Sequence, residues 1–358
     1  MKPFAGRPAT IKEVARLAGV GLGTVSRVLN NHHSVSPETR ERVRAAIDRL
    51  KYQPNLQARR LVRGKTETMG FVLGNRDFLD PFHAKMLSGV QRYFAETGQQ
   101  VVYTSLQYSG DAAASSMVLP KILSLRGVLD GVILAGTNYP NLLAALDKTR
   151  LPHVVFGNNL IADNGRGLAD SVSFDDEGGA AELAERLVCL GHRDIAYIGR
   201  MDLPWFRRRY EGYAHTMRAH ALPIRQCVQV DAPDSTRFGY LCLMTLLDSG
   251  EHVTAVCCGN DAVAFGAVKA ARERGLVIPD DISIAGFDDR DICFLTDPEL
   301  STVRPFLEQV GAECAGMLLA KIANPTERLP AVVIPTEVVL RGSTGPCKPT
   351  VRAALAAM

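Results

Sequence analysis

Thr24, Ser26 and Arg27 form a group of polar side chains that could contact DNA. They lie in a segment whose apolar residues repeat with the period of a helix, and all three would point away from its apolar side. An arginine can donate two hydrogen bonds to O6 and N7 of guanine, and the hydroxyls of threonine and serine suit phosphate oxygens. We therefore expect this segment to contact nucleic acid.

The charge of the chain is divided unevenly along its 358 residues. The first 65 residues contain 14 Lys and Arg against 4 Asp and Glu, a net charge of +10. The other 293 residues contain 27 against 34, or −7, and the two values sum to the whole-chain charge of +3. Because a basic segment attracts a polyanion and an acidic one does not, the sequence predicts a basic head that binds nucleic acid and a body with another task.

Three helices are expected to position the polar group in the head. Thr10-x-x-Glu13 has the spacing of a capping box, and Gly19 is suited to end the helix that it begins. A second helix is predicted over 22–30, and Ser36 with the following proline begins a third. Two short helices joined by a glycine turn are typical of a helix-turn-helix, whose second helix enters the major groove.

Two other interpretations of the head remain to be weighed. A generic three-helix bundle with a solvated basic face has the same periodicity. Gly19, Gly21 and Gly23 could suggest a dinucleotide-binding loop, but no strand precedes them, so that alternative lacks its structural context.

Four ordered motifs in the head resemble the LacI/GalR family of bacterial transcription regulators. They are Thr10-Ile11-Lys12-Glu13-Val14-Ala15, Thr24-Val25-Ser26-Arg27-Val28-Leu29-Asn30, Val35-Ser36-x-Glu38-Thr39-Arg40 and Tyr52-x-Pro54-Asn55. The resemblance continues to about residue 342. It implies a pseudo-palindromic operator in double-stranded DNA, contacted by Thr10, Leu22, Gly23, Thr24, Ser26, Arg27, Asn30, Asn55, Ala58 and Leu61.

The resemblance also makes residues 54–65 a hinge helix that orders on operator DNA. Leu61 matches the family's wedge leucine, which opens a base step in the minor groove. An ordinary basic linker is the alternative. The head departs from the family at Leu22 and Gly23, which occupy the two positions that most often select bases. Direct readout is therefore expected to depend on Arg27 and on DNA bendability.

The body alternates apolar runs with helical stretches, which predicts parallel sheets with helices on both faces. The expected strands are 69–73, 100–103, 131–134 and 153–156, then 195–198, 228–230, 255–258 and 282–285. The expected helices lie near 82–97, 112–125 and 141–146, then near 177–190, 205–220, 236–247 and 262–274. Two such sets form two α/β lobes, with ligands held at the carboxyl ends of the strands.

The resemblance implies a body like a periplasmic sugar-binding protein, with a small effector between the lobes. The domains are then a head at 1–53, the hinge, a body at 66–345 and a tail at 346–358. Within the body we expect one lobe at about 66–170 plus 300–332 and another at about 171–299 plus 333–345.

Family motifs that match in the body assign the effector site. The residues carried over are Phe82, Arg209, Asn260 and Asp288. Asn158 is added because it stands next to Gly157, the position that matches a family aspartate, and Trp205, one turn before Arg209, is added as a surface for a sugar ring. Asp261 is expected to cap the helix that begins at Ala262. Each residue also has a structural alternative: Phe82 and Trp205 as core, Arg209 as the partner of a surface acid, and Asp288 as a turn residue.

The class of effector stays open on the sequence. Gly157 stands where many family members carry an aspartate, and Arg207 and Arg208 precede Arg209. A neutral sugar is the first expectation; a sugar acid or a sugar phosphate gains weight from this charge balance, and a nucleobase is a weaker candidate.

Rival classes of protein fit the sequence less well. We find no nucleophile elbow, phosphate loop or zinc spacing, so an enzyme, a metal site and a cofactor are not expected. The N-terminus has no apolar signal core and no run suits a membrane span, which disfavours a transport solute-binding protein and predicts a cytoplasmic location. The family resemblance further implies a homodimer, and the short tail gives no sustained heptads for a tetramer.

Overall fold

The chain folds into two compact units, Met1–Thr66 and Glu67–Met358. The computed structural model describes residues 9–29, 32–52, 65–76, 81–125, 127–161, 168–226 and 230–348.

The first unit contains the three expected helices, α1 (Ile11–Ala18), α2 (Leu22–Leu29) and α3 (Pro37–Leu50). Glu13 reaches back to accept a hydrogen bond from the Thr10 backbone N–H at 2.7 Å. Gly19 ends α1 in the left-handed conformation at φ 64°, which costs glycine no steric strain. One side of each helix is buried in a common apolar core that includes Val14, Val25, Val28, Val43 and Ala46.

A six-stranded parallel sheet forms the first lobe of the body, in the order β11-β5-β4-β3-β1-β2. Its strands are β1 (Thr68–Gly74), β2 (Gln100–Leu106), β3 (Gly131–Gly136), β4 (His153–Phe156), β5 (Ser171–Phe174) and β11 (Val332–Ile334). Its helices are α5 (Pro81–Thr97), α6 (Lys121–Ser124), α7 (Pro140–Thr149) and α12 (Leu307–Ala323).

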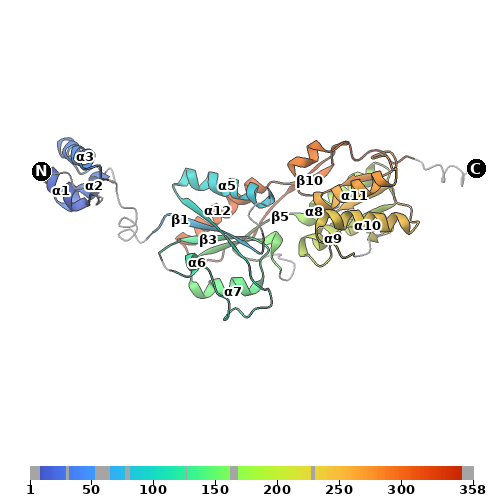
Figure 1. The fold of residues 1–358 in the computed structure, drawn as a ribbon, viewed down its shortest axis with the longest axis horizontal. Coiled ribbons are helices and arrows are strands. Elements are labelled where there is room, and N and C mark those ends of the chain that lie inside the picture. The colour runs from blue at the N-terminus through green and yellow to red at the C-terminus, as the bar shows by residue number, and fades with distance from the viewer. Residues whose placement is uncertain are drawn as a thin grey trace, which may run out of the picture. The chain divides into compact units, whose positions relative to one another are not determined.

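Alternate side chains of this sheet face opposite helical layers, as the period of a strand requires. Phe71 and Leu73 pack into the core that α5 and α12 share, whereas Val72 packs into a second core with residues of α6 and α7. Figure 1 shows α5 and α12 on one side of the sheet and α6 and α7 on the other. Burial on both faces explains why these strands are continuous apolar runs.

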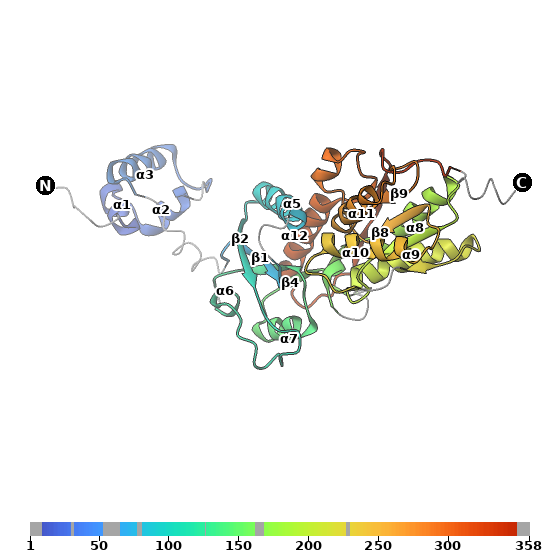
Figure 2. The same ribbon diagram turned by 45° about the vertical axis from the view of Figure 1, so that its right-hand side comes forward.

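A four-stranded parallel sheet in the order β7-β6-β8-β9 forms the second lobe (Figure 2). Its strands are β6 (Ile195–Ile198), β7 (Arg225–Gln226), β8 (Ala255–Cys258) and β9 (Ser283–Ala285). Its helices are α8 (Asp176–Cys189), α9 (Pro204–Ala219), α10 (Ser235–Asp248) and α11 (Asp261–Glu273). Tyr197 faces a core with α8 and α9, whereas Ile198 faces the core of α10 and α11.

Short elements connect the lobes. The antiparallel pair β10 (Thr302–Pro305) and β12 (Thr336–Val339) lies in the segments that lead into and out of α12. Two short 3₁₀ turns are η1 (Gly157–Asn159) and η3 (Asp291–Leu295). The chain therefore passes between the lobes next to β5, β10 and β12.

Three expectations about the body need correction. The lobe boundary expected at residue 171 falls too early, because β5 pairs with β4 and β11 in the first lobe. The helix expected over 112–125 is reduced to the four residues of α6, since residues 110–116 are mostly turns and bends and residues 117–120 have no regular structure. The strand expected at 228–230 lies largely outside the described residues, and β7 pairs at Arg225–Gln226.

No helix in the described part of the chain is long and apolar enough to cross a membrane.

Candidate functional site

The polar face of α2 is open to solvent. Gly23, Ser26 and Arg27 are exposed, Thr24 is half-buried, and the apolar side chain of Leu22 is 46% exposed. An exposed leucine at the N-terminal end of this helix suits contact with a thymine methyl group. Thr10 is half-buried beside the start of α1. The helix therefore presents the surface that a major-groove reader requires.

Four of the expected DNA-contacting residues lie outside the described part of the chain. They are Asn30, Asn55, Ala58 and Leu61, and most of the expected hinge 54–65 lies outside it as well.

A cavity of about 230 Å³ lies between the two lobes of the body. It is lined by Arg76, Pro81, Phe82, His83, Asn159, Trp205, Arg209, Ser235, Asn260, Ala262, Asp288 and Arg290. Five of the six expected effector residues are in this set. They come from the beginnings of α5, α9 and α11 and from the segment after β9, which all follow carboxyl ends of parallel strands.

Arg209 is fixed at the cavity by three partners. Its Nε donates to Asp176 at 2.8 Å, its Nη1 donates to the Gly259 carbonyl at 2.7 Å, and its Nη2 lies 3.2 Å from Asp288. The guanidinium carbon lies 3.7 Å from the ring centre of Phe287. Burial lowers the pKa of Arg209, but the attraction of Asp176 and Asp288 outweighs burial, and the net pKa is raised. The side chain is therefore charged and held rigidly.

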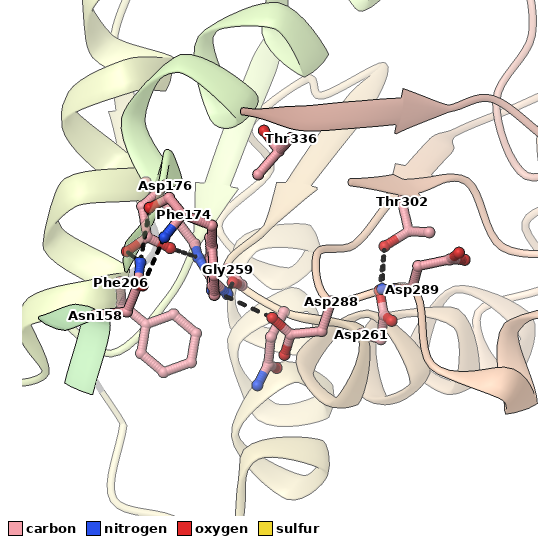
Figure 3. Close-up of polar contacts among 12 residues, drawn as sticks. Asn158, Phe174, Asp176, Phe206, Gly259, Asp261, Asp288, Asp289, Thr302 and Thr336 are labelled. Atoms are coloured by element: carbon pink, nitrogen blue, oxygen red, sulfur yellow. Dashed lines mark hydrogen bonds and ion pairs between the residues drawn. The ribbon is translucent and has the colours of Figure 1, made fainter. Parts of the chain in front are cut away.

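Asp176 is the hub of the buried network behind the cavity (Figure 3). Its side chain is 1% exposed, and besides Arg209 it accepts hydrogen bonds from Arg208, at 2.7 and 3.0 Å, and from the Asn158 amide at 2.9 Å. The first residue of α8 thus connects η1 in the first lobe with α9 in the second. This network positions Arg209.

Asn158 does not line the cavity, contrary to expectation. Its amide donates to the Phe174 carbonyl at 2.8 Å and accepts from the Phe174 N–H at 2.9 Å, which ties η1 to β5. The neighbouring Asn159 lines the cavity instead, and its amide lies 3.4 Å from Nε2 of His83. Asn159 is therefore the member of this pair that faces the cavity.

The segment 286–288 explains the Gly-Phe-Asp motif in physical terms. A Cβ on Gly286 would lie 2.3 Å from Oδ1 of Asp261, so only glycine fits. Phe287 is buried beneath Arg209 and stacks on Phe174. Asp288 then adopts φ 108°, a conformation that costs a non-glycine residue about 1–3 kcal/mol. This backbone conformation places the Asp288 carboxylate at the cavity, where 13% of the side chain is exposed.

Asn260 lines the cavity, as expected, and also takes the capping role that was expected of Asp261. Asn260 is the N-cap of α11, and its Oδ1 accepts from the Val263 N–H at 2.9 Å, which leaves the amide N–H groups as its remaining donors at the cavity. Asp261 is buried and accepts hydrogen bonds from the Thr302 hydroxyl at 2.6 Å (Figure 3) and from the Arg290 N–H at 2.8 Å. Burial, together with the nearby Asp288 charge, raises the pKa of Asp261 to about 7.

The aromatic residues at the cavity serve both core and site. Trp205 is only 6% exposed, and the Arg76 guanidinium lies 5.2 Å from its ring centre. Phe82 packs against Phe156 and Phe174 with ring centres 5.9 and 6.1 Å apart. Both side chains line the cavity, although nearly all of the Trp205 surface is buried.

Sequence reasoning missed several lining residues: Arg76, Pro81, His83, Asn159, Ser235, Ala262 and Arg290. Most of them follow strand ends or begin helices, so the rule that ligands bind at carboxyl ends of parallel strands could have found them. Arg290 carries a weaker signal, since it lies five residues beyond the end of β9 and precedes only the short 3₁₀ turn η3.

The cavity offers hydrogen-bond donors from arginine, asparagine and serine, one carboxylate acceptor and aromatic edges. Such a set suits recognition of a polar ring compound with hydroxyl groups. Within the described ranges, no cluster of three or more His, Cys, Asp or Glu could hold a metal ion.

Comparison with known proteins agrees with both units. The family model for bacterial regulatory proteins, lacI family, matches residues 10–55, and that for a periplasmic binding protein-like domain matches 184–344. The transcriptional regulator CelR of Thermobifida fusca is 32% identical over 342 residues, which cover 94% of this chain and 98% of that protein. Catabolite control protein A of Priestia megaterium is 29% identical and covers 94% and 99%.

Solved structures give the same result. The lac repressor dimer bound to operator and the anti-inducer ONPF has a TM-score of 0.79 at 25% identity, and the match covers 95% of this chain and 100% of that one. A CelR–cellobiose complex has a TM-score of 0.66 at 29% identity, with 94% and 100% covered. The chain belongs to the LacI family of bacterial regulatory proteins and is a DNA-binding transcriptional regulator with an effector-binding body.

Proposed function

We propose that this regulator is a repressor whose affinity for a pseudo-palindromic operator is set by a small sugar-type effector in the cavity between the lobes. The observation that carries the proposal is the convergence of Phe82, Trp205, Arg209, Asn260 and Asp288 on one cavity. A compact cavity with few fixed polar groups favours a ligand about the size of one sugar ring. CelR, by comparison, has been solved with cellobiose.

The roles of the side chains follow from their remaining hydrogen-bonding capacity. Asp288 accepts hydrogen bonds from effector hydroxyls, and Asn260 donates with its amide. Arg209 is held by Asp176 and Gly259 and provides a rigid donor and charge at the wall. Phe82 and Trp205 exclude water along the apolar face of the ring.

The cavity can couple the effector to DNA because both lobes line it. Arg76, Phe82 and Asn159 belong to the first lobe, whereas Arg209 and Asn260 belong to the second. An effector that contacts both lobes favours one relative orientation of the lobes over another. We propose that this orientation controls the hinge 54–65, with a coupling free energy of about 1–3 kcal/mol.

In the head, we propose that Arg27 reads a guanine, that Leu22 contacts a thymine methyl, and that Thr24 and Ser26 bind phosphate. We further propose a cytoplasmic homodimer without enzymatic activity. Support comes from the DNA-binding family and from the related lac repressor, whose structure is that of a dimer bound to operator.

Two steps test the function. Operator fragments are first selected from random duplexes with the full chain, and sugars are then screened by thermal shift. Anisotropy titrations next compare operator affinity with and without a hit, for the wild type and Asp288→Asn, with Asp248→Asn, an exposed carboxylate that pairs with Arg274 within the second lobe, as the matched control. We expect the hit to change operator affinity in the wild type and the control but not in Asp288→Asn. A hit that changes the affinity of Asp288→Asn equally contradicts the assignment.

A further inference from the structure

The cavity between the lobes is lined by more positive than negative side chains. Arg76, Arg209 and Arg290 line it, whereas Asp288 is the single carboxylate among the described lining residues. A neutral sugar needs hydrogen-bond partners but no net charge. Binding of a neutral sugar therefore does not account for the excess of positive side chains.

Two of the nearby arginines are already neutralised. Arg208 and Arg209 share Asp176, and Arg209 also pairs with Asp288 at 3.2 Å. These four groups carry two positive and two negative charges and are all largely buried. The network therefore adds no net charge to the cavity.

Arg290 differs from these arginines. Its backbone N–H donates to Asp261, but within the described residues its guanidinium makes no hydrogen bond or ion pair. The side chain is half-buried and lines the cavity. A guanidinium keeps its charge at any pH at which the protein is folded, and its planar donors match a carboxylate or a phosphate.

Three helices add to the positive potential at the same place. The first turns of α9, α10 and α11 contribute Trp205, Ser235 and Ala262 to the lining. Asp234 and Asn260 each accept one N–H at the starts of α10 and α11; the N–H groups that remain uncapped and the positive ends of the helix dipoles favour an anion.

We propose that the effector is an anionic sugar derivative whose carboxylate or phosphate binds Arg290. Its hydroxyls bind Asp288 and Asn260, as in the proposed function on which this inference rests. Arg76, fixed by a 2.8 Å hydrogen bond from its Nε to the Thr137 hydroxyl, lies on the first-lobe side of the cavity. The negative group thus binds on the second lobe and faces a cation on the first.

The test uses the full chain and isothermal titration calorimetry at matched ionic strength. The ligands are glucose and galactose, their uronic and aldonic acids, and their 6-phosphates. Each anionic ligand that binds is repeated with Arg290→Gln and with Arg272→Gln, which removes the same charge at an exposed position near the opposite end of α11.

We expect at least one acid or phosphate to bind more tightly than its neutral parent. Arg290→Gln should weaken that ligand about tenfold to hundredfold and leave the neutral parent unchanged, whereas Arg272→Gln should behave as the wild type. Preference for the acid or for the phosphate identifies the anionic group.

The remaining outcomes count against the inference in distinguishable ways. Binding of a neutral sugar in preference to its anionic forms, unaffected by Arg290→Gln, overturns the anionic effector and leaves the proposed function standing. Binding of none of the sugars overturns both.

Discussion

Asp176→Asn should strongly destabilise the body because it removes the negative charge from a buried network. The carboxylate accepts hydrogen bonds from Arg208, Arg209 and Asn158, and its side chain is 1% exposed. The asparagine amide would direct N–H groups toward guanidinium N–H groups, and only Asp288 would remain to balance two buried cations.

The size of the effect follows from the burial of this network. Removal of one partner of a buried ion pair costs about 3–5 kcal/mol, because the remaining charge stays desolvated without compensation. An exposed pair contributes about 0–1 kcal/mol. Asp202→Asn is the matched control, because Asp202 pairs with Arg200 at 3.2 Å on the surface, with 58% of its side chain exposed.

Equilibrium urea unfolding measures both variants. Trp205 is the single tryptophan of the chain and lies one turn of α9 before Arg209, so its fluorescence reports unfolding of this region. We expect Asp176→Asn to lower the free energy of unfolding by about 3–5 kcal/mol. A loss no larger than that of Asp202→Asn would refute the assignment of Asp176 as the electrostatic hub.

Three further predictions concern the head, a buried acid and the assembly. Arg27→Ala should remove about 1–3 kcal/mol of discrimination between operator and random duplex in anisotropy titrations while non-specific binding is largely retained; equal losses on both DNAs would contradict direct readout. The pKa of Asp261 is raised to about 7, so the folded state binds the proton more tightly than the unfolded chain, and stability should fall as pH rises from about 4 to about 7. Asp261→Asn should flatten that dependence in urea unfolding at several pH values, because the asparagine amide does not titrate and its oxygen can still accept from the Thr302 hydroxyl; an unchanged slope would refute the cause. Sedimentation velocity should give a dimer, and a tetramer would overturn this expectation.

The head was predictable from sequence because its signals are local. Each signal involves residues no more than about one helical turn apart. The signals are the capping box of Thr10 and Glu13, the left-handed conformation of Gly19 and the N-cap at Ser36. The major βα units of the body were predictable for a similar reason, since long apolar runs alternate with helical stretches.

Elements that depend on distant partners were missed. Strand β5 has only four residues and gains its place by pairing with β4 and with β11, which lies more than 150 residues later. Helix α12 was absent from the prediction, and the expected helix over 112–125 shrank to α6. Pairing partners of this kind cannot be inferred from a single short run.

Five of the six expected effector residues line the cavity, but the contacts of adjacent residues were not predictable. The motifs located Arg209 and Asp288, yet Asn260 caps α11 while Asp261 is the buried acid. Which of these two adjacent residues caps the helix depends on the residue at which α11 begins, and that start is one residue earlier than expected. Arg290 acquires its meaning only from the cavity that the fold creates.

The central claim is that the cavity and the operator are thermodynamically coupled. The most direct measurement is a closed cycle on the full chain: operator affinity with and without saturating effector, and effector affinity with and without saturating operator. We predict that both affinities change by the same factor, between about 5 and 150, because coupling free energy is reciprocal. Operator affinity that is identical with and without bound effector would contradict the account.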